Sequence, residues 1–258
     1  MKVRRMLLAL TAAWLAAATA QSGELLFESD VEQESAACWA QPPQAGCNGW
    51  VGIHGMLPST EHSRSGRQAL KVSFMHNEDV GSATREIEAR HVVVGFHDFY
   101  ARGFDFAAGM KILRLSAFDT ASQRNAFDIV LESRASAPDS NYCGLTDTAY
   151  LSIAYNGGPV DWGIVDAPFV FRRERWYAIR TEVRLNQPGL SDGLLRVWVN
   201  GQKLIERAGM NLVGTLPNPI NRIGFGGWYS NSAAGHNPCP DPVSPSTHFV
   251  DDVFIRRR

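Results

Sequence analysis

The feature that most constrains the fold is a run of alternating side chains in the second half of the chain. Between residues 176 and 186 apolar and charged residues alternate with a period of two, which is typical of a strand with one buried face. The apolar parity carries Tyr177, Ile179, Thr181, Val183 and Leu185, and the other parity carries Arg180, Glu182 and Arg184. A turn rich in Pro and Gly follows at 187–193, and a second alternating run at 194–199 ends in Asn200-Gly201, a tight-hairpin signal. With 202–206 this predicts three antiparallel strands.

Short strand-like runs separated by Gly, Pro and Asn turns fill most of the remaining chain. They cover residues 24–28, 69–74, 83–90, 99–106, 109–115, 127–134, 149–155, 222–228 and 248–255. Hardly any window has the periodicity of a helix. This pattern predicts an all-β fold, a two-sheet antiparallel jelly-roll sandwich of the concanavalin A-like kind.

The first twenty residues have the features of a secretory signal peptide. Three basic residues precede an apolar run at 6–18, and Ala18-Thr19-Ala20 is a small-x-small cleavage site. A membrane anchor is the alternative, but the run is shorter than the roughly 20 residues that a span needs. We therefore expect a signal peptide at 1–20 and a single β-jelly-roll domain at 21–258, secreted or periplasmic.

The charge balance excludes some partners. The formal net charge is −1, and loss of the three basic residues of the leader would make it −4. A mildly acidic protein is not built for non-specific nucleic-acid binding, so we expect no nucleic acid as a partner. We also expect no membrane association and a monomer.

Four cysteines lie in the predicted mature part, namely Cys38, Cys47, Cys143 and Cys239. An even number of cysteines in an exported chain predicts disulfides, and three pairings are possible. We favour Cys38–Cys47, which closes a short loop, together with Cys143–Cys239, which joins two long loops. A zinc site is the alternative, but no CxxC pair or close Cys/His spacing supports it.

Charged residues recur on the polar parity of several expected strands. They are Glu86, Glu88 and Arg90, then Asp128, Glu132 and Arg134, then Arg180, Glu182 and Arg184. One reading is an ordinary solvated outer face. The other is the floor of a cleft for an acidic, extended ligand, where basic groups bind carboxylates or sulfates.

Residues 98–115 resemble one segment of the jelly-roll polysaccharide lyases, a strand, a Phe-rich turn and a Gly-x-Lys strand. These lyases are the alginate- and glucuronan-lyase types and their heparin-lyase relatives. Residues 176–201 and the closing Asp251-Asp252-Val253 resemble the same proteins. The hairpin pattern is shared by many concanavalin-like sandwiches, including non-catalytic sugar binders, so it supports fold more than activity.

The resemblance implies β-elimination on a uronate-containing polysaccharide. One alginate-lyase group uses a Lys after a Gly, an Arg on the next long strand, and two Tyr on the strand after that. Lys111 matches the Lys, Arg134 lies near the Arg position, and Tyr150 matches the first Tyr, while Ser152 stands at the second. These three matches are the predicted catalytic residues. The predicted substrate-binding residues are Arg180, Glu132, Trp228 and Tyr229, with an acidic polysaccharide as the partner.

A structural Ca²⁺ is the one cofactor that we expect. Glu28 lies on the first expected strand and Asp251 on the last, and terminal strands of such sandwiches often run side by side. Carboxylates from both could then bind Ca²⁺ with backbone carbonyls, because this ion prefers several oxygen ligands. The alternative is a pair of solvated acids.

Three functions fit these features. The first is a lyase, and the second is a non-catalytic carbohydrate-binding module. The third is a glycoside hydrolase, whose two carboxylates, drawn from Glu86, Glu88 and Glu132, would have to face a cleft about 5–10 Å apart. Isolated histidines such as His97 and His248 are further candidates for a base.

Overall fold

The computed structural model describes most of the expected mature chain. The described residues are 23–35, 37, 50, 56–74, 83–104, 106, 110–119, 121–122, 124–134, 148–157, 160–226 and 246–258. The leader, the four cysteines, Trp228 and Tyr229 lie outside them, so the predictions made for those residues are untested. Within the described ranges, no helix is long and apolar enough to cross a membrane.

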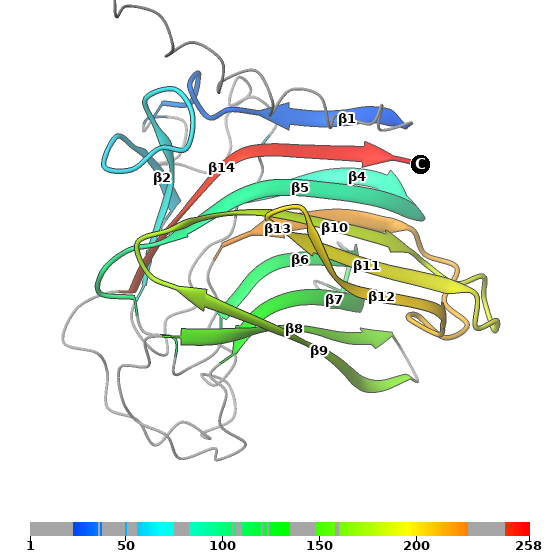
Figure 1. Ribbon diagram of the computed structural model, residues 1–258. Coiled ribbons are helices and arrows are strands. Elements are labelled where there is room, and N and C mark those ends of the chain that lie inside the picture. The colour runs from blue at the N-terminus through cyan, green and yellow to red at the C-terminus, as the bar shows by residue number, and fades with distance from the viewer. Residues whose placement is uncertain are drawn as a thin grey trace, which may run out of the picture.

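The strands form two antiparallel sheets packed face to face (Figure 1), which confirms the two-sheet sandwich. One sheet has eight strands, in the order β12 (Gln202–Met210), β11 (Gly193–Val199), β10 (Trp176–Arg184), β5 (His91–Tyr100), β14 (Ser246–Arg257), β3 (Ala69–Phe74) and β2 (Met56–Ser59), with β1 (Glu24–Ser29) paired to β14. The other has six, in the order β4 (Ala83–Ala89), β13 (Ile220–Phe225), β6 (Met110–Asp119), β7 (Arg124–Arg134), β8 (Thr148–Gly157) and β9 (Val160–Arg172).

The hydrophobic core lies between the two sheets. Inward positions alternate along each strand, as with Val92, Val94 and Phe96 on β5 and Leu113 and Leu115 on β6. These side chains belong to one continuous buried cluster, so burial of apolar area from both sheets holds the sandwich together. Side chains of the opposite parity therefore lie on the outer faces, where ligands have access.

The expected hairpin is present with the expected faces. Ile179 pairs with Val199 across β10 and β11, and both are buried in the core. The turn into β12 places Asn200 at φ 51° and Gly201 at φ 80°, the left-handed conformations that a two-residue hairpin needs. One residue departs from the pattern, because Glu182 lies on the charged parity yet is only 4% exposed.

Two parts of the strand prediction were wrong. The run expected at 99–106 is instead the end of β5 and a turn, in which the Phe104 N–H donates to the Ala101 carbonyl. β5 itself and β9 were not predicted. Much of β5 is buried on both parities, including Val93 at 2% exposed, so its segment from Val92 to Phe96 is an apolar run without alternation.

Candidate substrate-binding face

Two of the predicted site residues, Lys111 and Glu132, lie on neighbouring strands of the six-stranded sheet, and Ser152 lies on the next strand. β6, β7 and β8 are adjacent, and the register places Lys111 opposite Glu132 and Glu132 opposite Ser152. Directly opposed residues in antiparallel strands have Cβ atoms about 4.5–5.5 Å apart. Lys111, Glu132 and Ser152 therefore form one row across three strands.

A second row follows two residues further along β7. Arg134 pairs with Tyr150 through the backbone, on positions of the same parity as Glu132 and Ser152. The side chains of Arg134 and Tyr150 lie outside the described part of the structure. The strand order thus brings the backbone positions of all three predicted catalytic residues to one end of one sheet.

The first row occupies the outer face of the six-stranded sheet. Its neighbours along the strands, Leu131 on β7 and Leu151 and Ile153 on β8, point into the core. Glu132 and Ser152 are nevertheless only 2% and 0% exposed, and Lys111 is half-buried. Polar groups in such an enclosed row interact more strongly than they would in water.

The Ser152 hydroxyl is a buried polar group that the rest of the row does not satisfy. Among the described residues its Oγ has no hydrogen-bond partner. A buried hydroxyl without a partner costs about 1–3 kcal/mol. Ser152 therefore places a donor and an acceptor that no described residue satisfies beneath the surface of the row.

An irregularity in β6 sets the position of Lys111. The register shifts between Lys111 and Leu113, so β6 has one extra residue relative to β7 at this point. Met110 and Ile112, on either side of Lys111, are both buried. Such bulges redirect side chains and are frequent beside functional sites.

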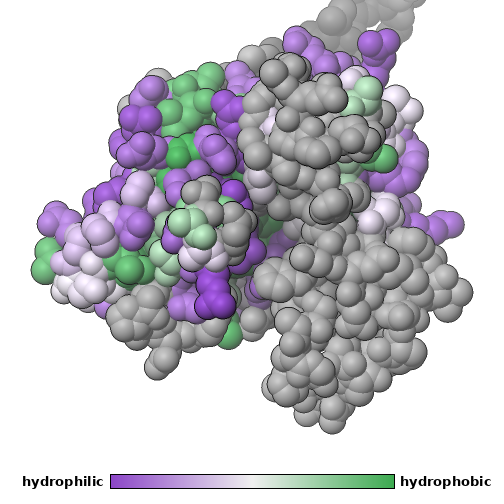
Figure 2. Space-filling model, turned by 180° about the vertical axis from the view of Figure 1, so that it is seen from behind, coloured by the Kyte–Doolittle hydropathy of each residue, from purple (hydrophilic) through white to green (hydrophobic). Residues whose placement is uncertain are grey.

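Further along β6 and β7, the same outer face carries an ion pair between Arg114 and Asp128. The Arg114 Nε and Nη2 atoms each donate a hydrogen bond to one oxygen of Asp128, and the donor–acceptor distance is 2.7 Å in both. The side-chain amide of Asn125 also donates to that carboxylate. A bidentate pair of this kind holds both side chains in one geometry. Figure 2, seen from behind Figure 1, shows hydrophilic residues over most of the described surface, with smaller hydrophobic areas among them.

Arg180, predicted to bind substrate with this group, does not lie on the same sheet. It is on β10 in the eight-stranded sheet, and its parity is opposite to that of the core residues Ile179 and Val183. Its guanidinium stacks on the Trp198 ring, 3.8 Å from the centroid. The two outer faces point away from each other across the sandwich, so Arg180 cannot share a groove with Lys111.

His248 is not a surface base. It is fully buried, and its Nδ1 lies 2.8 Å from the Oδ1 of Asp98, which is also fully buried. Burial and the neighbouring Asp98 carboxylate raise the pKa of Tyr100 well above its ordinary value. These residues form a polar cluster inside the sandwich rather than a site open to a polymer.

His97, the other histidine candidate, contacts the closing strand. Its Nδ1 lies 3.2 Å from the Oδ2 of Asp252, which also accepts a hydrogen bond from Ser65 on its other oxygen. The contact with His97 is the main cause that lowers the pKa of Asp252. His97 therefore fastens β5 to β14, on the eight-stranded sheet and away from Lys111.

The expected calcium ligands come from strands that do run side by side, since Glu28 pairs with Phe254. Asp251 is buried, and its carboxylate accepts the backbone N–H groups of Arg64, Ser65 and Asp252. Burial raises the pKa of Asp251, against the lowering effect of those bonds. Its oxygens are already engaged with the backbone, which leaves them less able to serve a metal.

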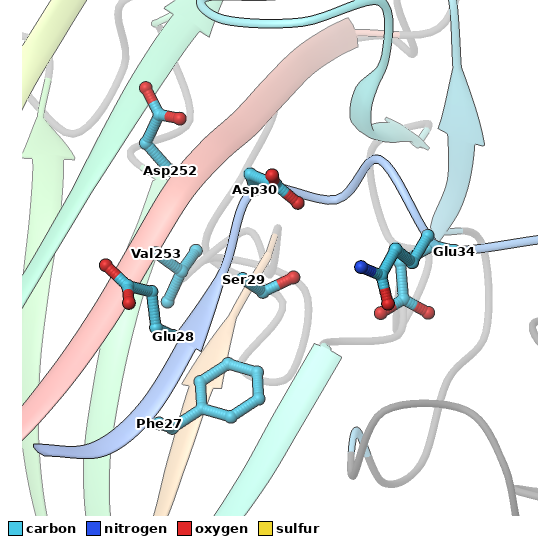
Figure 3. A pocket seen from close by; sticks show the side chains of 8 residues that line it. Phe27, Glu28, Ser29, Asp30, Glu34, Asp252 and Val253 are labelled. Atoms are coloured by element: carbon cyan, nitrogen blue, oxygen red, sulfur yellow. The ribbon is translucent and has the colours of Figure 1, made fainter.

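A pocket of about 500 Å³ lies between β1, the turn after it and β14 (Figure 3). Its acidic residues are Glu28, Asp30, Glu34 and Asp252, so Asp252 rather than Asp251 shares it with Glu28. Among the described residues, no group of three or more His, Cys, Asp or Glu side chains is arranged to hold a metal ion. Calcium stays a prediction.

The carboxylates that a hydrolase would need are not all together. Glu86 and Glu88 lie on β4, while Glu132 lies on β7, with β13 and β6 between them. Three strand spacings are about 14 Å, which exceeds the separation of two hydrolytic carboxylates. Glu132 therefore does not pair with either residue in a hydrolytic site.

Sequence reasoning missed one acid beside the row. Asp166 on β9 lies opposite Ser152 and is exposed. It was missed because β9 was not predicted as a strand. Its position extends the row Lys111, Glu132 and Ser152 to a fourth strand.

Comparisons with known proteins bear on the fold and on one segment of the sequence. A family profile described as polysaccharide lyase 14 matches residues 152–236, less than half of the chain. A search of curated protein sequences found no match. Similar solved structures number 136 chains.

Lyases are among these structures. An endo-β-1,4-glucuronan lyase from the fungus Trichoderma reesei has a TM-score of 0.60 at 13% identity, covering 91% of this chain and 96% of that one. An alginate lyase from Chlorella virus has a TM-score of 0.59 at 13% identity, covering 91% of this chain and 100% of that one. The marine PL-14 alginate lyase from Aplysia kurodai has a TM-score of 0.59 at 12% identity, covering 79% of this chain and 87% of that one.

At these identities the structural likeness shows the fold alone. The profile match adds a likeness in sequence, over a segment that begins at Ser152 and includes the β10–β12 hairpin. By fold and by sequence profile, the chain resembles the jelly-roll polysaccharide lyases.

Proposed function

We propose that this protein is a polysaccharide lyase that cleaves a uronate-containing polysaccharide by β-elimination on the outer face of the six-stranded sheet. The observation that carries the proposal is the register of β6, β7 and β8. It brings Lys111, Glu132 and Ser152 into one row, with Arg134 and Tyr150 paired in the next. The likeness to alginate and glucuronan lyases supports the same reaction class.

β-Elimination needs three tasks at one sugar unit. A cation or a polar donor neutralises the uronate carboxylate, which makes the proton on C5 more acidic. A base removes that proton, and its electron pair forms the C4=C5 double bond. The bond from C4 to the bridging oxygen breaks, and an acid protonates the leaving oxygen.

The residues of the two rows have the chemistry for these tasks. Arg134 suits the carboxylate, because a guanidinium can bind it through two parallel hydrogen bonds. Tyr150 and Lys111 suit proton removal and delivery. Glu132 and Ser152 are almost fully enclosed, so we assign them to the support of Lys111, which lies opposite Glu132 and is half-buried.

The first test is an absorbance assay for unsaturated product. Purified protein is incubated with alginate, glucuronan and glycosaminoglycans, and ultraviolet absorbance of the new double bond is followed. We expect absorbance to rise on at least one acidic polymer and on no neutral one. Folded protein that yields no rise on any of them would refute the proposal.

A non-catalytic carbohydrate-binding module is the second candidate. The observation that favours it is Ser152, which stands where the resemblance implies a second tyrosine. Such a module would be retained by an acidic polysaccharide without turnover, and Lys111→Ala would leave its binding unchanged. The absorbance assay and a retention assay together separate the two.

We also propose export with cleavage after residue 20, and a structural Ca²⁺ beside β1 and β14. Mass spectrometry of the exported protein should show a chain that begins at Gln21. A chelator should lower the melting temperature, and added Ca²⁺ should restore it. An uncleaved chain would refute the first proposal, and an unchanged melting temperature the second.

A further inference from the structure

The outer face of the eight-stranded sheet carries a row of side chains with no role in the reaction proposed above. Across β12, β11, β10, β5 and β14 the register aligns Lys203, Trp198, Arg180, Gly95 and Phe254. These five strands lie side by side in Figure 1. Their four spacings span roughly 19 Å, a length that suits several sugar rings of an extended chain.

Two aromatic rings flank Arg180 in this row. Trp198 lies under the Arg180 guanidinium at 3.8 Å and is half-buried. On the other side, the Phe254 ring lies over Gly95, because a Cβ built on that glycine would be 2.1 Å from the ring. The absence of a side chain at Gly95 thus lets the Phe254 ring occupy the space over the strand between it and Arg180. Aromatic rings on an outer sheet face are suited to stacking against sugars.

The charge of Arg180 is available to a ligand. Among the described residues, Arg180 makes no hydrogen bond or ion pair. Burial lowers its pKa, against the raising effect of the nearby Glu182 carboxylate, so its charge is partly desolvated and would gain from a further anionic partner.

The acids nearby are already neutralised by other residues. Glu182 lies 2.9 Å from His91, 3.4 Å from Arg196 and 3.8 Å from Arg258. Glu206 is paired with Arg196 at 2.7 Å and with Lys203. The row therefore presents an excess of positive charge, which is complementary to a polymer of uronates.

We propose that Trp198, Arg180 and Phe254 form a second glycan-binding surface, which we name the platform, and that it holds an acidic polysaccharide by ring stacking and carboxylate pairing. The class of ligand, an acidic polysaccharide, rests on the proposed function. The existence of the platform rests only on the arrangement of its side chains. Since it lies on the sheet opposite Lys111, it would hold the polymer on the enzyme without taking part in cleavage.

The test is retention on polymer by a protein that cannot cleave it. Lys111→Ala protein is run by affinity electrophoresis through gels that contain alginate, glucuronan, a neutral polysaccharide or no polymer. Arg180→Gln and Trp198→Ala are added separately to that background. Arg67→Gln, which removes the charge of a side chain that is 90% exposed in the loop between β2 and β3, is the matched charge control. Thermal unfolding establishes that each variant is folded.

We expect an acidic polymer to retard the Lys111→Ala protein, and each platform substitution to weaken that binding about tenfold. Arg67→Gln should change nothing, and the milder Trp198→Phe should keep most of the binding. Equal retention by the platform variants, or equal retention on a neutral polymer, would overturn the proposal. This experiment measures binding, so its result does not depend on the lyase assay. If the lyase assay failed, retention on the gels would still test the platform.

Discussion

Lys111 is the single residue on which the proposed chemistry depends most. It lies opposite Glu132 on a bulged strand and is half-buried in an enclosed polar row. A lysine in such surroundings can exchange a proton or neutralise a carboxylate.

We predict that Lys111→Ala lowers kcat/KM on the acidic polymer by about 10²–10⁴-fold, the usual contribution of a residue that transfers a proton. The melting temperature should change little, because Lys111 lies on an outer face. Lys71→Ala, a strand lysine of the other sheet that pairs with Glu61, is the control and should keep full activity. Activity within a few-fold of wild type in Lys111→Ala would remove this residue from the mechanism.

Asn186 has a comparable importance for stability. Its side-chain oxygen accepts the N–H groups of Leu212 and Val213, and its amide donates to the carbonyls of Gln187 and Gly214. It is fully buried, so it ties the loop after β10 to the segment after β12.

We expect Asn186→Ala to cost about 2–4 kcal/mol in the free energy of unfolding, since several buried partners lose their bonds at once. Asn186→Asp should also destabilise, because it loses both donors and buries a charge. Urea titration gives the numbers. A loss below about 0.5 kcal/mol in both variants would mean that water replaces these bonds at no cost.

At the level of elements, β10 is held to the strands on both sides through Glu182. Burial alone would raise the pKa of Glu182, but the hydrogen bond from His91 and the charges of Arg258 and Arg196 lower it. A carboxyl with a lowered folded pKa stabilises the fold above its unfolded pKa of about 4.3 and loses that effect as pH falls through the folded value.

Glu182→Gln should therefore cost about 1–2 kcal/mol at pH 7, and less as the pH falls below about 4. Unfolding of both proteins by urea across this pH range measures the difference. A cost that stays constant down to acid pH would show that the charge of Glu182 is not what stabilises these strands.

β5 and β14 approach each other closely where Gly95 faces Phe254. We expect Gly95→Ala to destabilise by about 1–3 kcal/mol, because its Cβ would overlap the ring. In a Phe254→Ala background the same change should cost much less, and a double-mutant cycle measures this coupling. If the free-energy costs of Gly95→Ala and Phe254→Ala simply added, the Phe254 ring would not lie over Gly95.

At the scale of the whole molecule, the parts that alternation encodes could be predicted from the sequence. The β10–β12 hairpin was predicted because apolar and charged residues alternate, and Asn200-Gly201 marks its turn. β5 was missed because burial on both faces removes alternation. The burial of Glu182 could not be foreseen, since its partners His91 and Arg258 come from distant parts of the chain.

The candidate site was predictable only through resemblance. Lys111, Glu132 and Ser152 are far apart in the sequence, and only the strand order of the sheet aligns them. The same order shows that Arg180 lies on the other sheet, which composition and spacing could not reveal. Sheet membership is a long-range property, so local patterns do not determine it.

The mass of the products tests the proposed lyase reaction most directly. Elimination adds no water, so each cut should leave a fragment with an unsaturated uronate at its new end, one water lighter than the product of hydrolysis. We predict that digestion of an acidic polymer in H₂¹⁸O yields these lighter fragments without the heavy isotope at the scissile oxygen. Saturated fragments that carry ¹⁸O would show hydrolysis and contradict the lyase assignment.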